Sequence, residues 1–215
     1  MNCQRAHIIA ILFIFLFANT ASVKALKTAS PEILTQVNRI TIPFMKNRGQ
    51  IKDSGILYYS NTFACKVLVN KDGSISYGPI KNENGKVTSN YVVREKLVNA
   101  LDFSPQGEQK AIAKVSHFIG KNPKDWLKDI FTFNLINMGE VYKGVQLKLQ
   151  AHGNNVEKFF YINPKIDPQN IRLRIDGAQN LNVNSKGELE ISTESKVMRF
   201  SKPKAYQKVN GKKYR

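Results

Sequence analysis

Cysteine is scarce in this chain, which has only Cys3 and Cys65 among its 215 residues. Cys3 precedes the apolar segment near the N-terminus, and a lipoprotein acceptor would have to follow that segment, so lipid attachment at Cys3 is excluded. If Cys3 is removed with a leader, Cys65 stands alone and an internal disulfide is excluded. Cys65 lies in the apolar context F-A-C-K-V-L-V, where we expect a small buried hydrophobe and not a nucleophile.

Histidine and acidic residues are also few, with three His and 16 Asp plus Glu. His117 and His152 are far apart, whereas a zinc site needs three or four converging ligands. Ser116 and His117 are adjacent and would point to opposite faces of a strand. The acidic residues are few, several of them stand beside lysine, and no carboxylate pair for glycoside hydrolysis can be chosen. The sequence therefore predicts no catalytic residue, no metal site and no cofactor.

A calcium loop is suggested only weakly by Asn70, Asp72 and Gly73, because the later acidic ligands of such a loop are missing. The same residues are typical of a hairpin turn, which is the interpretation we favour.

Long basic runs are absent although the formal net charge is +17. Such a charge suits anionic partners, among them nucleic acid, a membrane surface or an acidic polysaccharide. The lysines are scattered singly, however, and no run reaches five basic residues. Scattered lysines are typical of solvated faces and protected sheet edges, so no specific nucleic-acid binding is predicted.

Only one long apolar run occurs, from Ile8 to Ala18, after Arg5 in a short polar stretch. It is shorter than the roughly 20 residues that a membrane-spanning helix needs. Together with Val23 and Ala25 it has the pattern of a Sec signal peptide, 1–25, cleaved after Ala25. Cleavage after Ala21 and an uncleaved anchor are the alternatives. We therefore expect an exported protein that is secreted or at the cell surface, with the periplasm or the outer-membrane face as further destinations.

From residue 40 onward, β-strand signals dominate, after a leader segment at 26–39. Residues 145–152 (V-Q-L-K-L-Q-A-H) alternate strictly between apolar and polar, and 156–162 (V-E-K-F-F-Y-I) completes a hairpin with them. Further hairpin turns are expected at the following sites: Asp72–Gly73 (as a type I′ turn), Asn84–Gly85, 185–187 and Asn210–Gly211.

These signals predict an all-β, mostly antiparallel fold of two packed β-sandwich-like lobes, 40–113 and 114–215. Residues 105–113 are expected to form a turn and a connection. Only four residues follow Gly211, so we expect the last hairpin to be truncated, in a fragment or in a gene model that ends early. An internal similarity between 69–77 (V-N-K-D-G-S-I-S-Y) and 183–191 (V-N-S-K-G-E-L-E-I) suggests two similar lobes, although the turn chemistry is common.

Two groups of residues are candidates for structural roles. Asn47, Gly49 and Gln50 are expected to form a polar cluster at a turn where Gly49 has a positive φ. Trp126 is expected to fill the edge of the core, next to a turn capped by Asn122 or Asp125. A carbohydrate-stacking role for Trp126 is the alternative.

Several ordered elements resemble a known family, the N-terminal domain of unknown function that precedes SBBP-type β-propeller repeats in large secreted bacterial proteins. The elements are F-M-K-N-R-G-Q (44–50), H-F-I-G-K-N-P-K-D-W (117–126), V-Y-K-G-V-Q-L (141–147), V-E-K-F-F-Y-I (156–162), D-P-Q-N-I-R-L-R-I-D-G-A (167–178) and P-K-A-Y-Q-K-V-N-G (203–211). The residues that carry the resemblance are Phe44, Asn47, Gly49, Gln50, Gly120, Asn122, Pro123, Trp126, Tyr142, Gly144, Gly177, Pro203, Tyr206 and Gln207. His117, Lys121 and Gln146 depart from the family pattern.

The resemblance implies a non-catalytic N-terminal module of a secreted or cell-surface repeat protein, with a role in assembly, display or adhesion. Its partners would be the downstream repeat domains of the same protein. The alternative is a module that binds an anionic polysaccharide or an envelope ligand through lysines and exposed aromatic residues. A hydrolase is the least favoured interpretation, and the sequence predicts no oligomeric state.

Overall fold

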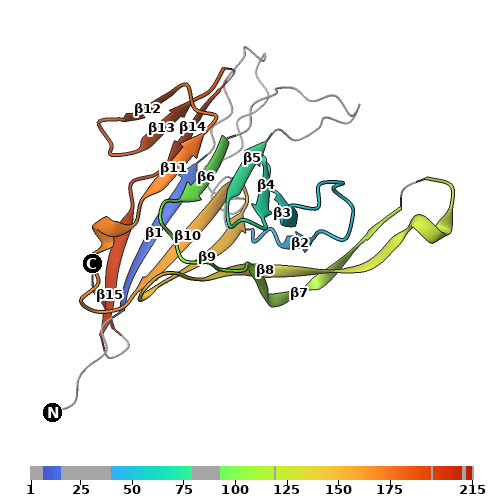
Figure 1. Cartoon of the computed structure of the whole chain (residues 1–215), viewed down its shortest axis with the longest axis horizontal. Coiled ribbons are helices and arrows are strands. Elements are labelled where there is room, and N and C mark those ends of the chain that lie inside the picture. The colour runs from blue at the N-terminus through green and yellow to red at the C-terminus, as the bar shows by residue number, and fades with distance from the viewer. Residues whose placement is uncertain are drawn as a thin grey trace, which may run out of the picture.

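The structure, a computed structural model, describes residues 7–15, 40–78, 93–118, 120–194, 196–209 and 212–214. Within these ranges the chain is all-β, with antiparallel strand pairs and two short 3-10 helices, which confirms the predicted fold class (Figure 1). The strands are β1 (His7–Phe15), β2 (Phe44–Lys46), β3 (Ile56–Asn61), β4 (Lys66–Asn70), β5 (Ile75–Gly78), β6 (Val93–Leu97), β7 (Gln106–His117), β8 (Leu127–Tyr142), β9 (Val145–His152), β10 (Asn155–Ile162), β11 (Leu173–Asp176), β12 (Asn180–Val183), β13 (Leu189–Ser192), β14 (Val197–Phe200), β15 (Lys204–Val209) and β16 (Lys212–Tyr214). The helices are η1 (Pro123–Asp125) and η2 (Pro168–Asn170).

The strands form a strongly curled sheet with a small second sheet at one end. Along the curl the order is β11-β6-β5-β4-β3-β2-β8-β9-β10-β1, and β1 continues to the smaller sheet β14-β13-β12. β15 pairs with β1 and with β16, and β7 pairs with β8. The β7–β8 hairpin extends well beyond the rest of the molecule (Figure 1).

The core lies inside the curl and follows from the alternation of the strands. In β9, Val145, Leu147 and Leu149 are buried, and the residues between them are more exposed, as the sequence pattern predicts. The apolar core continues with residues of β3–β6, β8, β10, β13 and β14. Cys65 is fully buried, and burial raises the pKa of its thiol to about 12, which confirms that it behaves as a small hydrophobe.

The predicted hairpins at Asp72–Gly73 and at 185–187 both form, joining β4 to β5 and β12 to β13. The predicted type I′ turn is wrong, because at Asp72–Gly73 only Gly73 has a positive φ. The two turns share their geometry: the Gly73 N–H donates to the Asn70 carbonyl, and the Gly187 N–H donates to the Asn184 carbonyl. The upstream strands differ, since β3 pairs with β4 whereas β11 pairs with β6. The internal similarity thus holds at the level of the hairpin.

Residues 105–113, expected as a turn and a connection, largely form β7, so that expectation is wrong. The pairing with β8 is interrupted by register shifts, and it gives an extended structure to a segment with little apolar alternation of its own.

Ala113 lies within β7, and the division into two lobes stays a prediction. β15 and β16 pair on either side of Asn210–Gly211, while that turn, Asn84–Gly85 and residues 26–39 lie outside the described residues.

Residues 7–15 form β1, which lies between β10 and β15 (Figure 1). The pairing with β10 runs from Ile8 opposite Ile162 to Phe13 opposite Glu157, and β15 pairs along the other edge. In the part of the chain that the structure describes, no helix has the length and apolar character that a membrane span requires.

Deleting residues 1–25, the predicted signal peptide, should lower the midpoint of thermal unfolding. The deletion removes β1 and leaves the backbone groups of β10 and β15 without their partner strand. We expect 26–215 to melt at least about 5 °C below 1–215 in the same mild detergent, because 1 kcal/mol shifts the midpoint by about 2–4 °C at this size. Equal midpoints would contradict a stabilising role for β1.

Candidate functional site

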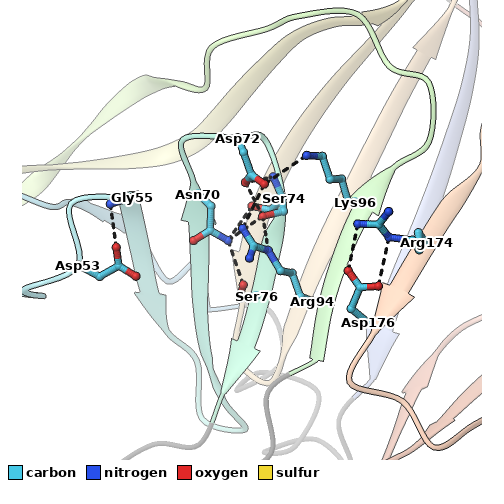
Figure 2. Close-up of polar contacts among 10 residues, drawn as sticks. All are labelled: Asp53, Gly55, Asn70, Asp72, Ser74, Ser76, Arg94, Lys96, Arg174 and Asp176. Carbon is cyan, nitrogen blue, oxygen red and sulfur yellow. Dashed lines mark hydrogen bonds and ion pairs between the residues drawn. The ribbon is translucent and has the colours of Figure 1, made fainter.

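A polar cluster covers the outer face of the sheet at the β4–β5 turn (Figure 2). We call Asn70, Asp72, Ser74, Arg94 and Lys96 the turn clamp. Asp72 accepts hydrogen bonds from the Ser74 backbone and hydroxyl, at 3.1 and 2.6 Å, and forms ion pairs with Arg94 and Lys96 at 3.1 and 3.3 Å. Arg94 Nε also donates to the Ser74 hydroxyl at 2.7 Å. Strand β6 is thereby tied to the turn.

Two open hollows border the turn clamp. One, of about 320 Å³, is lined by Gly73, Lys96 and Phe103, and the other, of about 440 Å³, by Ile56, Ser76 and Arg94. Asp72 lines both. A side chain at position 73 would meet the Phe103 ring at 2.4 Å, so the close approach of that ring requires glycine.

The charges of the turn clamp are already partnered within the cluster. Burial raises the pKa of Asp72, but the Ser74 and Lys96 hydrogen bonds and the Arg94 charge outweigh it and hold the pKa well below its usual range. The calcium-loop alternative required further acidic ligands, and the structure instead places basic groups on Asp72. The turn clamp is therefore best described as a device that fixes the turn, which agrees with the predicted hairpin.

Asp72→Asn should destabilise the protein at neutral pH by about 2–4 °C, the shift that 1 kcal/mol gives at this chain length. Because the folded-state pKa is depressed, the stabilisation is present above the unfolded pKa of about 3.9 and is lost as the pH falls through lower values. The thermal unfolding midpoints of the wild type and of Asp72→Asn should therefore become equal at acidic pH.

Asp176→Asn is the matched control for that comparison, since Asp176 pairs with Arg174 among the described residues and both side chains are exposed. We expect the thermal unfolding midpoint of Asp176→Asn to differ very little from that of the wild type. Equal losses in both variants, or a loss for Asp72→Asn that persists undiminished in acid, would contradict a clamping role.

The second candidate surface is the projecting part of the β7–β8 hairpin, described for residues 110–118 and 120–131, which we call the arm (Figure 1). Large apolar side chains are uncovered along it: Ile112 is fully exposed, and Phe118 and Phe131 are 60% and 45% exposed. Lys110 and Lys114 lie over the Phe131 ring, with Nζ at 4.5 and 5.7 Å from its centroid. The arm therefore presents apolar and cationic groups side by side.

The tip of the arm is ordered by η1. Asn122 caps it by accepting from the Lys124 N–H at 3.1 Å, as predicted, and Pro123 occupies its first turn. Trp126 packs edge-on against Phe118 with centroids 5.2 Å apart, and its Nε1–H donates to the Gly120 carbonyl at 3.4 Å. The expectation that Trp126 fills the core edge is wrong, because it packs locally on the arm.

The base of the arm is anchored to the curled sheet. Glu108 forms an ion pair with Lys148 of β9 at 2.6 Å and accepts from the Asn137 amide at 2.7 Å. The Lys148 hydrogen bond lowers the pKa of Glu108, against burial, with help from Asn137. The Gly107 N–H donates to the Tyr58 hydroxyl, and a side chain at Gly107 would collide with the Phe133 ring at 2.4 Å.

The predicted polar cluster at Asn47, Gly49 and Gln50 is confirmed as a turn. The Asn47 amide donates to the carbonyls of Ile51 and Ile56, each at 3.0 Å, and its oxygen accepts from two backbone N–H groups. Gly49 has a φ of 111°, and the Gln50 side-chain amide donates to the backbone carbonyl of Lys46 at 3.0 Å.

The other predicted signature residues are spread over the fold. Phe44 is fully buried in the core, and the Tyr142 hydroxyl donates to the Val98 carbonyl at 2.8 Å. Gly120, Gly144 and Gly177 all have positive φ values. The remaining residues precede or belong to β15, and they are Pro203, Tyr206 and Gln207. These residues do not converge on one site.

Sequence reasoning missed one group of chemically active residues inside the curl. Lys158 of β10 and Glu95 of β6 are buried and form an ion pair at 2.6 Å. The alternation of the two strands contains a signal. Glu95 lies between Val93 and Leu97 on the apolar face of β6, and Lys158 lies between Val156 and Phe160 on the apolar face of β10. Among the described residues, no group of three or more His, Cys, Asp or Glu could hold a metal ion.

Comparison with known proteins places the chain in a family. A family model described as a domain of unknown function (DUF7948) matches residues 44–215. The chain belongs to this family. The match begins at Phe44, and it contains the turn clamp, the arm and all the signature elements. No curated protein and no solved structure matches the chain.

Proposed function

We propose that this DUF7948 protein is a non-catalytic module of a secreted or cell-surface repeat protein, and that the arm is its contact surface in assembly, display or adhesion. The observation that carries the proposal is the exposure of Ile112 and Phe118 on a hairpin that projects from the curled sheet (Figure 1). Isolated two-stranded ribbons are only marginally stable in water, so an apolar arm is stabilised further when a partner covers it.

The partner we propose is the SBBP-type repeat region that the resemblance of the sequence implies. A repeat domain with an apolar groove or edge would cover the uncovered side chains of the arm. The predicted export signal supports the export that such a role requires, and with β1 in the sheet we propose its uncleaved form. Lys110 and Lys114 would lie at the rim of the contact and affect its rate of formation more than its strength.

Substituting the apolar residues of the arm should weaken this contact. We expect Ile112→Ser with Phe118→Ser to reduce binding to a purified SBBP-type repeat segment by about tenfold or more, because burying one large apolar side chain contributes about 1.5–3 kcal/mol. Biolayer interferometry on the immobilised full chain measures the change. Ile112 is fully exposed, so its substitution should be mild for folding; Phe118 packs against Trp126, and circular dichroism therefore checks that the double variant keeps its fold.

A second candidate function, binding of an anionic polysaccharide, is favoured by the lysines that lie against Phe131. Heparin and vesicles containing phosphatidylglycerol serve as probes in the same instrument. Lys110→Glu with Lys114→Glu is compared with Lys186→Glu and Lys202→Glu, which change the net charge equally but lie at the β12–β14 sheet. Saturable heparin binding lost only with the arm lysines, without binding to the repeat segment, would replace the main proposal. Unchanged binding in every arm variant would overturn both.

A further inference from the structure

The interior of the curl contains a compact group of reactive side chains. Lys158 of β10, Glu95 of β6 and Tyr77 of β5 are all buried, with exposed fractions of 0%, 2% and 0%. Glu95 and Tyr77 come from the paired strands β6 and β5, whereas Lys158 comes from β10, which is not a neighbour of either strand in the sheet. Solvent-borne ligands have no access to these groups, so their chemistry is restricted to one another.

The three groups are aligned on one carboxyl. Lys158 Nζ lies 2.6 Å from Glu95 Oε2, and the Tyr77 hydroxyl donates to Oε1 at 3.1 Å. Both carboxyl oxygens are therefore engaged, and the amine nitrogen is held against the carboxyl group through Oε2. On its other side the amine lies 4.3 Å from the centre of the Phe200 ring, which packs edge-on to Tyr77 at 6.1 Å.

The surroundings make the charged form of the Lys158 amine less favourable than it is in water. Burial lowers the pKa of Lys158, although the Glu95 charge and hydrogen bond oppose it. Burial and the Glu95 charge raise the pKa of Tyr77 well above its usual value, so the phenol stays protonated and keeps donating to Oε1. Separated charges are costly in such an interior, and transfer of one proton from Lys158 to Glu95 yields a neutral amine beside a neutral acid.

We propose that Lys158 and Glu95 condense to an intramolecular amide bond that joins β10 to β6. After the proton transfer, the lone pair of Nζ attacks Cδ of Glu95, while the Tyr77 hydroxyl stabilises the negative charge that develops on Oε1. The C–Oε2 bond then breaks, and a second proton from Nζ converts the leaving hydroxyl into water. One C–N bond forms, one C–O bond breaks and one water leaves, so no oxidant, nucleotide or further reactant is needed.

Such a bond would cross-link two strands covalently, as a disulfide does in chains with more cysteines. Glu95 and Lys158 are 63 positions apart, so the link closes a long loop and restricts the unfolded chain. Cys65, the cysteine within the described residues, is free and buried. The amide would also replace a buried charge pair by neutral, hydrogen-bonded groups.

Mass spectrometry of the purified full chain tests the proposal. We expect the intact mass to fall below the calculated mass by one water, with the N-terminus of the sample established by sequencing. Tryptic digestion should give a branched peptide that joins the Glu95 and Lys158 segments. An intact mass equal to the calculated one, with both residues recovered in linear peptides, would overturn the proposal.

Two variants keep the result specific. Lys158→Met removes the amine but keeps an unbranched apolar side chain, and its mass should equal the calculated value. Loss of water also occurs when an Asp–Gly sequence such as Asp72–Gly73 cyclises, and a loss that persists in Lys158→Met would assign the change there and refute the amide. Tyr77→Phe removes the donor to Oε1, and we expect a larger fraction of unlinked chain at equal times after purification.

Discussion

The curled sheet depends on one contact across its interior, between Lys158 of β10 and Glu95 of β6. These strands are not neighbours in the sheet, and Phe200, which lies against the Lys158 amine, belongs to the smaller sheet. One buried group therefore fixes three sets of strands relative to each other. Removing either charged partner would leave the other buried and uncompensated, at a cost of about 3–5 kcal/mol. Apolar packing alone could close the curl in several ways, whereas this pair has one geometry.

That contact requires the strand registers to be exact, because a shift by one residue would turn Glu95 to the outer face. The registers are set by asparagine side chains in the turns. The Asn70 amide donates to the Ser74 backbone and hydroxyl, Asn184 accepts from two backbone N–H groups, and Asn47 bridges its own turn. The turn clamp adds to this by tying β6 to the β4–β5 turn. Outer-face polar contacts and the inner-face ion pair thus specify the same register.

Local alternation allowed much of the fold to be predicted, and the failures have a common origin. Residues 145–152 and 156–162 alternate clearly, and their hairpin is present as expected. Gln106–His117 carries no such pattern and is extended because β8 pairs with it, which is a non-local cause. Trp126 could not be assigned to the arm from the sequence, because the local sequence around an isolated aromatic residue does not distinguish the edge of a core from a projecting turn. Lys158 and Glu95 each occupy an apolar-face position of their strand, but their pairing depends on the curl and could not be read from the sequence.

The arm shows how apolar residues can be retained without a role in the core. Its base is held by the Glu108–Lys148 pair and by the approach of Phe133 to Gly107, and its tip by η1 and the Phe118–Trp126 contact. Lys110 and Lys114 cover one face of Phe131. Ile112 and the outer face of Phe118 take no part in these contacts and remain exposed to water. Burial of such side chains by the proposed partner would stabilise the protein, and this contact would account for their exposure.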